Sequence, residues 1–235
     1  MPTAVVTGAS RGIGRAIAGM LAVEGYDLCI AARSRDGLDR LAAELGAVSG
    51  RIDVASFVLD VTDADQVRAT AQAIGDHVGA VDVMVANAGV GAFGAMADFE
   101  LDTFDRLFAV NVRGVMLTLQ AFTPALQAAD SGLAVVVSSD VSTRVFPGGG
   151  PYCATKHAVR ALARTYQQEH PELRVLELRP GATDTFFADT DEGDAGPGHL
   201  TADEVAEALR GVLRLPAHVR PEELVVRSTA QTPEY

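Results

Sequence analysis

The sequence predicts an α/β protein built on one parallel, doubly wound sheet with helices on both faces. Short apolar segments alternate with longer segments of helical periodicity along all 235 residues. Most of the short segments lack alternating polar residues, as is typical of strands that helices cover on both sides. No shift in composition marks a second domain, and single α/β domains of this length are common. We therefore expect one domain spanning residues 1–235.

The order of strand and helix segments predicts parallel pairing through right-handed crossovers. The expected strands are Ala4–Thr7, Asp27–Ala31, Phe57–Leu59, Val81–Ala86, Leu133–Ser138, Arg174–Leu178 and Leu224–Arg227. The expected helices are Gly12–Glu24, Gly37–Leu45, Ala64–Ile74, Thr103–Ala128, Tyr152–Glu169 and Ala202–Leu215. Gly25 and Gly46 stand where helix C-terminal caps are needed, and Asp63 and Thr201 stand where N-terminal caps are needed.

Charge and composition exclude several classes of partner. A formal net charge of −12 argues against nucleic acid and anionic membrane surfaces. No apolar stretch reaches membrane-spanning length, and the N-terminus enters an apolar strand without the basic segment of a signal peptide. The two cysteines, Cys29 and Cys153, are too few for a disulfide framework. We expect a cytoplasmic protein with reduced thiols.

A glycine-rich turn separates the first expected strand from the first helix. Its residues are Gly8, Ser10, Arg11, Gly12, Ile13 and Gly14. Glycines there permit a tight turn and close approach of a pyrophosphate, which the amides of the helix N-terminus stabilise. Such a turn alone is a weak signal, because turns also use glycine for structure. Its place between strand and helix indicates a dinucleotide site.

Basic residues follow the second strand, where an NAD-binding site would carry an acidic side chain. Arg33-Ser34-Arg35 stands there, and Arg11 lies in the glycine turn. Guanidinium groups form bidentate hydrogen bonds with phosphate, so Arg11 and Arg33 can converge on a 2′-phosphate. A pair of ordinary surface arginines is the alternative. The sequence favours NADP(H) over NAD(H).

Two further motifs end expected strands. Asp60-Val61 follows the third strand, where Asp60 can hold the adenine amino group or, alternatively, cap the next helix. Asn87-Ala88-Gly89 follows the fourth strand, at the edge of the sheet where ligands bind in such folds. As a lone tripeptide it is also compatible with a simple turn.

Lys156 is the only lysine in a chain with 18 arginines, and it stands four residues after Tyr152. Residues at this spacing share a helix face. An adjacent ammonium favours phenolate, so we expect the Tyr152 pKa to be lowered toward a range useful for proton transfer. An ordinary Tyr/Lys pair on a solvated helix is the alternative.

Taken together, these motifs resemble those of the short-chain dehydrogenase/reductase family. The matching residues are the Thr7–Gly14 turn, Asp60, Asn87-Ala88-Gly89, Asn111, Ser139, Tyr152 with Lys156, and Pro180-Gly181 with Thr183. The resemblance covers nearly the full length and implies a Rossmann-type sheet of about seven strands. It also implies an active site at the carboxyl ends of strands four to six. One departure is Ala86, where many relatives have a second asparagine.

The resemblance implies roles for these residues. Tyr152 is expected to act as general acid in carbonyl reduction and as base in alcohol oxidation, with Lys156 bound to the nicotinamide ribose. Ser139 is expected to hold the substrate oxygen, because Ser138 is one position off the family spacing. Asn111 is expected to position a water that links Lys156 to solvent. The residues expected to contact the nicotinamide carboxamide are Pro180, Gly181 and Thr183.

The implied function is NADP(H)-dependent, reversible hydride transfer between nicotinamide and a small ketone, aldehyde or hydroxy compound, without a metal. A non-catalytic dinucleotide-binding sensor or scaffold is the alternative on the same fold. A sensor needs no proton donor, which argues against it. A nucleotide-sugar epimerase or dehydratase needs a larger C-terminal domain than 235 residues provide.

The acidic segment 184–200 interrupts the strand–helix pattern and is expected to form a lid over the substrate. Metal binding by its carboxylates with His199 is the alternative, although they match no known ligand spacing. Apolar residues near the motifs either line a substrate pocket or belong to the core: Met96, Val141, Val145, Phe146, Phe186 and Phe187. Two of the expected helices are long and partly apolar, and helices of this kind pair between subunits in the resembled family. The resemblance therefore implies a homodimer or homotetramer, unless this apolar surface is buried within one chain.

Overall fold

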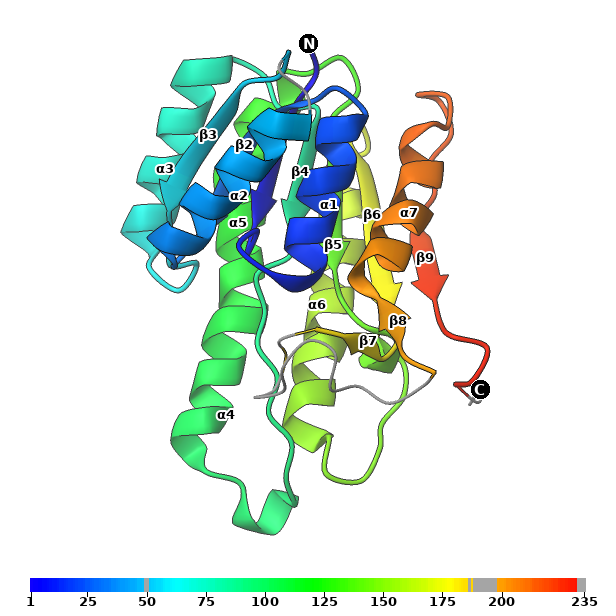
Figure 1. The fold of residues 1–235 in the computed structure, drawn as a ribbon. Coiled ribbons are helices and arrows are strands. Elements are labelled where there is room, and N and C mark those ends of the chain that lie inside the picture. Colours follow the sequence, from blue (N-terminus) through cyan, green and yellow to red (C-terminus); the bar gives the residue numbers. More distant parts are fainter. Residues whose placement is uncertain (49–50, 186, 188–197, 232–235) are drawn as a thin grey trace.

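A single parallel sheet organises the chain (Figure 1). The computed structural model describes residues 1–48, 51–185, 187 and 198–231. In these residues seven strands pair in the order β3-β2-β1-β4-β5-β6-β9. Their bounds are β1 Thr3–Thr7, β2 Asp27–Ala32, β3 Val54–Val58, β4 Val83–Ala86, β5 Leu133–Val137, β6 Arg174–Pro180 and β9 Glu223–Val226. The predicted Rossmann-type, doubly wound α/β fold is confirmed.

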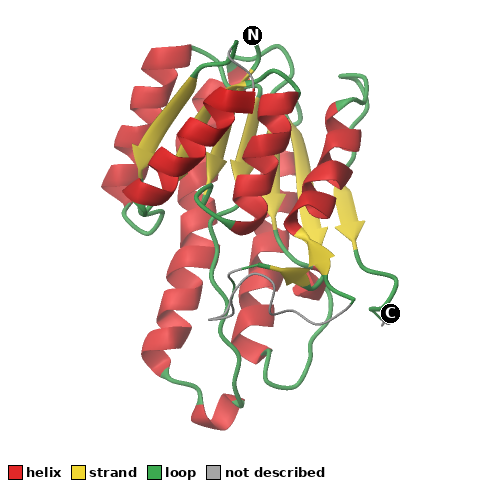
Figure 2. Ribbon diagram, viewed as in Figure 1, coloured by secondary structure: helices red, strands yellow, loops and turns green. Residues whose placement is uncertain are grey.

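Helices cover both faces of the sheet (Figure 2). One layer consists of α1 Gly12–Val23, α2 Arg35–Val48 and α7 Ala202–Leu213, and the other of α3 Ala64–Val78, α5 Gly114–Gln127 and α6 Gly150–Glu169. A separate apolar cluster fills each interface: Ile17 and Leu209 lie on the first side, and Phe122 and Val159 lie on the second. Because helices pack on both sides, the strands β1 and β5 are buried throughout. This explains why they lack polar alternation.

The strand order reverses between β1 and β4, and this reversal positions the ligand crevice. From β1 the chain continues outward to β2 and β3, whereas β4 begins the other half of the sheet. The two strands pair in parallel, with Ala4 opposite Val83 and Val6 opposite Val85. Segments that follow β1 and β4 therefore diverge at the carboxyl edge, which is where open α/β sheets bind ligands.

The predicted helix caps are correct at three of four positions. Asp63 Oδ1 accepts hydrogen bonds from the first-turn amides of α3, and Thr201 forms a reciprocal capping box with Glu204 at the start of α7. Gly25 follows α1 with a φ of 84°, the left-handed conformation of a helix C-terminal glycine. The predicted cap at Gly46 is wrong, because α2 continues to Val48. Gly46 lies within that helix, where a Cβ would meet open space.

Other boundaries differ where tertiary pairing decides them. The third strand begins at Val54 rather than Phe57, because it pairs with β2 from Leu28 onward. The expected helix Thr103–Ala128 consists of α4 Leu101–Phe108, a π-helical segment Ala109–Arg113 and α5. Such wide turns depend on contacts with neighbouring elements, and they occur frequently at functional sites.

Two short strands lie at the ends of the predicted lid. β7 Thr183–Asp184 pairs in parallel with β8 Leu200–Thr201, which brings the two ends of the segment 184–200 together. Residue 186 and residues 188–197, which form most of this segment, lie outside the described residues. None of the described helices is long and apolar enough to span a membrane.

Candidate active site

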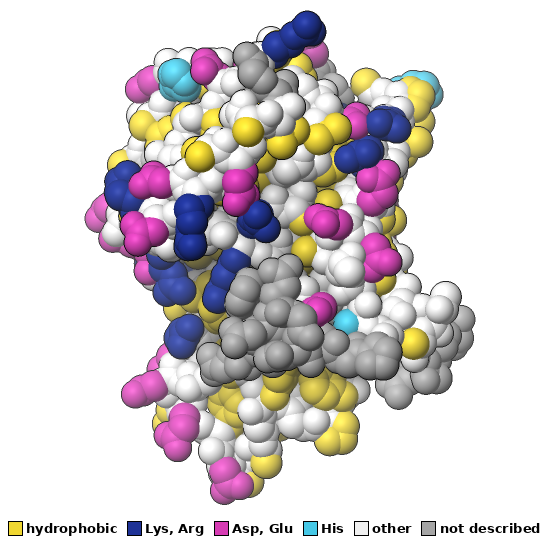
Figure 3. Space-filling view, viewed as in Figure 1, with side chains coloured by type: hydrophobic (Ala, Val, Ile, Leu, Met, Phe, Trp, Pro, Cys, Tyr) yellow, Lys and Arg dark blue, Asp and Glu magenta, His cyan; other side chains and the backbone are white. Residues whose placement is uncertain are grey.

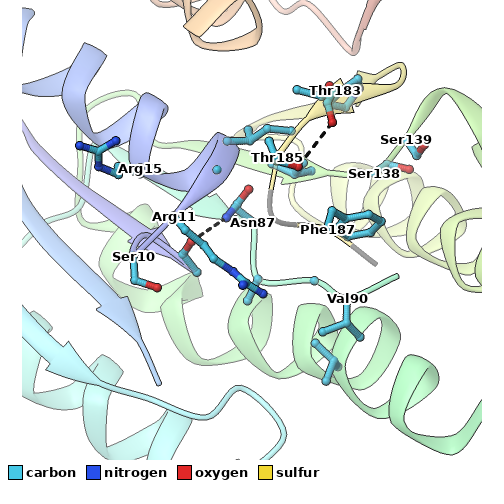
Figure 4. Close-up of a pocket in the computed structure, with 18 of the residues that line it drawn as sticks. Ser10, Arg11, Arg15, Asn87, Val90, Ser138, Ser139, Thr183, Thr185 and Phe187 are labelled. Carbon is cyan, nitrogen blue, oxygen red and sulfur yellow. Dashed lines mark hydrogen bonds between the residues drawn. The ribbon is translucent and has the colours of Figure 1, made fainter. Parts of the chain in front are cut away.

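A cavity of about 1160 Å³ opens at the carboxyl edge of the sheet (Figure 4). The segments after β1, β2, β3, β4 and β5 and the end of β6 contribute to its walls. All but two of the predicted site residues line it, the exceptions being Gly14 and Asn111. Motifs that are far apart in the sequence therefore converge on one cavity.

The glycine turn packs directly against the chain that follows β4. Gly8 and Gly12 have φ values of 65° and 55°, a left-handed conformation that other residues adopt at a cost. A Cβ on Gly8 would lie 2.9 Å from the Cα of Ala88. A Cβ on Gly14 would lie 2.4 Å from the Gly8 carbonyl oxygen. Glycine is thus required at these positions for close packing, and Gly14 acts beneath the cavity rather than in its wall.

Asn87 connects the two segments (Figure 4). Its Nδ2 donates to the Thr7 carbonyl at 2.9 Å and to the Gly8 carbonyl at 3.2 Å. The Thr7 hydroxyl accepts from the backbone amides of Asn87 and Ala88 at 3.1 and 3.2 Å. The predicted turn at Asn87-Ala88-Gly89 is therefore a structural brace for the glycine turn as well as part of the cavity wall.

Arginines surround the end of the cavity next to α1 and α2. Arg11 and Arg33, which the sequence predicted, line it and are exposed. Arg15 and Arg40 also line it, and neither was predicted from the sequence. Arg15 stands four residues after Arg11 on α1, so helical spacing could have revealed it. Figure 3 shows basic side chains gathered on this face beside α2.

Ser34 and Asp60 have local structural partners in addition to their place in the wall. The Ser34 hydroxyl accepts from the Gly37 amide at 3.1 Å, in the first turn of α2. Asp60 Oδ1 accepts from the Thr62 amide and hydroxyl at 2.9 and 2.8 Å. Asp63, not Asp60, caps α3, so the capping alternative for Asp60 is wrong. Asp60 and Val61 both line the cavity.

Tyr152 lies in the first turn of α6 and is only 8% exposed. The Phe93 and Phe187 rings pack edge-on against it, with centroids 5.5 and 5.6 Å away. Burial raises the pKa of Tyr152, a hydrogen bond with Ser139 opposes this, and the charge of Asp140 adds to it. The prediction that the Tyr152 pKa is lowered is therefore wrong for the protein without a bound cofactor, because burial raises this pKa more than the interaction with Ser139 lowers it.

Lys156 is buried beside Tyr152. Its Nζ donates to the Val137 carbonyl at 3.2 Å and lies 5.8 Å from the centre of the Tyr152 ring. Burial lowers the pKa of Lys156 to about 8, although the charge of Glu177 raises it in part. The alternative of a solvated Tyr/Lys pair is excluded, because both side chains are buried and line the cavity.

Asn111 links the chain after β4 to α6. It lies in the π-helical segment, 1% exposed. Its Oδ1 accepts from the Val90 amide at 2.8 Å, and its Nδ2 donates to the Val90 carbonyl at 2.9 Å. Nδ2 also donates to Thr155 Oγ1 at 3.1 Å, and Thr155 Oγ1 donates to the Tyr152 carbonyl at 2.7 Å. Asn111 thereby fixes the first turn of α6 from behind.

The two serines after β5 have different surroundings. Ser139 Oγ donates to Asp140 Oδ1 and accepts from the Val141 amide, both at 3.3 Å. Its interaction with Tyr152 also opposes the rise in the Tyr152 pKa. Ser138 Oγ is buried and has no hydrogen-bond partner among the described residues. Both serines line the cavity.

The end of β6 and the residues that follow it form another part of the cavity wall. Pro180, Gly181 and Thr183 line the cavity, and the Thr183 hydroxyl donates to the Gly181 carbonyl at 2.9 Å. Two neighbours were not predicted. The side chain of Gln231 packs on Gly181, and the side chain of Thr185 lies over Gly12.

Aromatic side chains form an apolar collar around Tyr152. Val141, Phe146 and Phe187 line the cavity as predicted, together with Val90 and Phe93, which were missed. Val145 and Met96 are 68% and 77% exposed and do not line it, so their prediction as pocket or core residues is wrong. Phe186 lies outside the described residues.

The acidic segment gives no metal centre within the described part of the chain. No group of three or more His, Cys, Asp or Glu side chains there is arranged to hold a metal ion. His199 lines the cavity, while Asp189, Asp191, Glu192 and Asp194 lie outside the described residues.

Comparisons with known proteins agree with this geometry. The sequence model described as short chain dehydrogenase matches residues 2–195. An alcohol dehydrogenase from the archaeon Thermococcus sibiricus, solved with 5-hydroxy-NADP, superposes with a TM-score of 0.97 at 47% identity over 100% of both chains. A metagenomic short-chain oxidoreductase solved with NADP superposes with a TM-score of 0.83 at 30% identity, covering 98% of each chain.

Curated relatives give the same assignment. The glycine betaine reductase of Emericella nidulans is 38% identical over 95% of this chain, which spans only 18% of that longer protein. An uncharacterised oxidoreductase of Staphylococcus saprophyticus is 29% identical over 97% of this chain and 96% of its own length. With the family's sequence model matching most of the chain and the cavity assembling its motifs, the protein is an oxidoreductase of the short-chain dehydrogenase/reductase family and uses a nicotinamide cofactor.

Proposed function

We propose that the protein is an NADP(H)-dependent oxidoreductase that interconverts a small ketone or aldehyde and the corresponding alcohol. The observation that carries this proposal is the buried pair of Tyr152 and Lys156 in the same cavity as the glycine turn. The two solved relatives described above were crystallised with NADP or a derivative of it. The proposed reaction joins a proton-transfer site to a dinucleotide site.

The residues present fit a phosphorylated dinucleotide. Glycine at positions 8 and 12 lets the turn pack tightly at the start of α1. The α1 N-terminus would stabilise a pyrophosphate there with its dipole and amides. Arg11 and Arg33 line the cavity, and their guanidinium groups would bind a 2′-phosphate by bidentate hydrogen bonds. The residue directly after β2 is Arg33. A carboxylate at this position would bind the ribose hydroxyls and favour NAD.

Tyr152 is suited to donate a proton during reduction. Because burial raises its pKa, the phenol keeps its proton at neutral pH. The bound nicotinamide would supply the hydride, and the substrate oxygen would gain negative charge. Ser139 and Tyr152 would donate hydrogen bonds to that oxygen, and Tyr152 would then transfer its proton. Lys156, with a pKa of about 8, would supply a positive charge beside the phenol below that pH.

The aromatic collar indicates the kind of substrate, and a groove on another face indicates how copies of the chain would assemble. Phe93, Phe146 and Phe187 around Tyr152 favour a small, partly apolar carbonyl compound. A groove between α5 and α6 contains Met116 and Leu162, and Met116 is 46% exposed. We propose that this face contacts a second copy of the chain in a homodimer or homotetramer. We further propose that the chain forms one domain, that residues 184–200 form a lid over the substrate, and that the protein acts in the cytoplasm.

The first experiment measures oxidation of NADPH by absorbance in the presence of a panel of small ketones, aldehydes and hydroxy acids. The proposal predicts turnover with at least one carbonyl compound and a higher kcat/KM for NADPH than for NADH. Tight binding of NADPH without oxidation by any member of the panel would favour a non-catalytic sensor.

A substitution tests the cofactor preference. Arg33→Ala should weaken NADPH binding about 10-fold or more, because one charge-assisted pair to phosphate is lost, while NADH binding stays the same. Arg35→Ala is the matched control, since Arg35 is an exposed neighbour that does not line the cavity. Equal losses for both cofactors in Arg33→Ala would remove Arg33 from the phosphate site.

A further inference from the structure

A buried guanidinium holds the turn that carries Ser139. Ser139 is followed by a short helical turn, η3 Asp140–Ser142. Arg179 projects from β6 behind this turn and is 5% exposed. Its Nε donates to the Ser139 carbonyl at 3.4 Å, and its Nη2 donates to the Asp140 carbonyl at 3.3 Å and to Thr143 Oγ1 at 2.5 Å. One side chain thus contacts the turn at three points.

Arg179 is itself fixed by partners on other elements. Its Nη1 donates to Glu223 Oε2 on β9 at 2.9 Å. Glu177, 1% exposed and also on β6, accepts from the Ser142 hydroxyl at 2.9 Å. Arg160 on α6 joins both carboxylates, at 2.7 Å to Glu177 and 2.6 Å to Glu223. The turn after Ser139 is therefore bound to β6, β9 and α6 through one ionic network.

The side chain of Asp140 continues this network into the cavity wall. Asp140 is 3% exposed, and its Oδ2 pairs with Arg144 at 2.5 Å and with Arg227 at 3.4 Å. Its Oδ1 accepts the hydroxyl hydrogen bond of Ser139. Neighbouring charged side chains therefore orient both the backbone and the hydroxyl of Ser139. Arg179 itself does not line the cavity.

Stability alone gives little reason for such a network. Burying several charges costs desolvation energy that apolar side chains of similar volume would avoid. The ionic partners here restrict the position of the Ser139 hydroxyl. The rate of an enzyme reaction is sensitive to displacements of about 1 Å in the groups that contact the substrate. The contacts on two successive carbonyls and a hydroxyl also require a planar fork, which a lysine ammonium cannot provide.

We propose that Arg179 is a positioning residue that fixes the Ser139 hydroxyl for its contact with the substrate oxygen. This inference rests on the proposed function, because it assumes that Ser139 contacts substrate. Arg179 acts through Ser139 and touches neither substrate nor cofactor. Its removal should therefore change the rate of the reaction without changing the binding of NADPH.

A double-mutant cycle between Arg179→Lys and Ser139→Ala tests the proposal. Ser139→Ala alone should lower kcat by roughly 10²-fold, as expected for loss of a hydrogen bond to the developing oxyanion. Arg179→Lys alone should lower kcat about 10-fold, with the Kd for NADPH unchanged. In the Ser139→Ala background, Arg179→Lys should have almost no further effect on kcat, because its target is already absent.

The matched control is Arg164→Lys. Arg164 belongs to the same network through Glu222 and Glu223, but it lies on α6 and, among the described residues, forms no hydrogen bond or ion pair with the η3 turn. The Arg164→Lys substitution should leave kcat unchanged in both the wild-type and the Ser139→Ala background. If Arg179→Lys does not fold, Thr143→Val removes the exposed acceptor of Arg179 and should lower kcat about 3-fold only when Ser139 is present.

Two outcomes separate the inference from the function on which it rests. The same fold-loss from Arg179→Lys or Thr143→Val with and without Ser139 would overturn the positioning role while the proposed function stands. A wild-type kcat in Ser139→Ala would instead overturn the assumed contact between Ser139 and substrate.

Discussion

Replacement of Lys156 by methionine should stabilise the protein at neutral pH while it removes activity. Burial lowers the pKa of Lys156 from its ordinary 10.5 to about 8. A lysine whose folded pKa lies below its unfolded pKa destabilises the native state at every pH below the folded value. The penalty disappears as the pH rises from about 8 through 10.5, where the unfolded chain also loses its proton.

The expected magnitude follows from the same two values. A pKa that falls from 10.5 to about 8 corresponds to roughly 3 kcal/mol of native-state penalty at neutral pH. Methionine fills a similar volume but leaves the Val137 carbonyl without the 3.2 Å bond from Nζ, which costs about 1 kcal/mol. The net gain is about 2 kcal/mol, which for a chain of this length raises Tm by roughly 4–8 °C.

Thermal unfolding of the wild type and Lys156→Met at pH 7 and pH 10.5 measures this effect. The variant should melt higher at pH 7, and most of the difference should be absent at pH 10.5. Because Lys156 is the only lysine, no other ammonium side chain contributes to the comparison. Lys156→Arg is the control, since it keeps its charge throughout and should show no such gain. A Lys156→Met protein that melts lower at pH 7, or gains equally at both pH values, would refute the reasoning.

Three further outcomes are expected. Gly14→Ala should weaken NADPH binding by at least about 10-fold in a fluorescence titration, because its Cβ would lie 2.4 Å from the Gly8 carbonyl oxygen; unchanged affinity would contradict the packing account. Asp63→Ala should lower the free energy of unfolding in urea by about 1 kcal/mol and leave kcat unchanged, because two first-turn amides of α3 lose their acceptor. Alcohol oxidation should accelerate as pH rises above neutral, because burial raises the pKa of Tyr152 and the base form is scarce at neutral pH; a rate that falls over this range would count against Tyr152 as the base.

The sequence was sufficient for the sheet and for most of the cavity wall. In a parallel sheet every motif that directly follows a strand lies at the same edge, so correct strands place Gly8, Asn87 and Ser139 together. Spacing within one helix likewise places Tyr152 beside Lys156. These inferences need only local periodicity and the direction of the strands.

The remaining features depend on tertiary contacts that local patterns do not encode. The π-helical turn at Asn111 is stabilised by hydrogen bonds to Val90 and Thr155, which are far away in the sequence. The pKa of Tyr152 is raised because Phe93 and Phe187 help to bury it, and both lie on other segments. A charged residue within an apolar strand gives no indication of its partners before folding, so the contacts of Arg179 could not be predicted from the sequence.

The most direct test of the central claim compares Tyr152→Phe with the wild type in two assays on the same preparation. Fluorescence titration gives the Kd for NADPH, and NADPH absorbance gives turnover with a carbonyl substrate of the wild type. We expect an unchanged Kd and a loss of turnover of about 10²–10⁴-fold, since phenylalanine keeps the packing of the ring but has no proton to donate. Turnover that stays near the wild-type value in Tyr152→Phe would contradict the claim that this buried phenol performs the proton transfer.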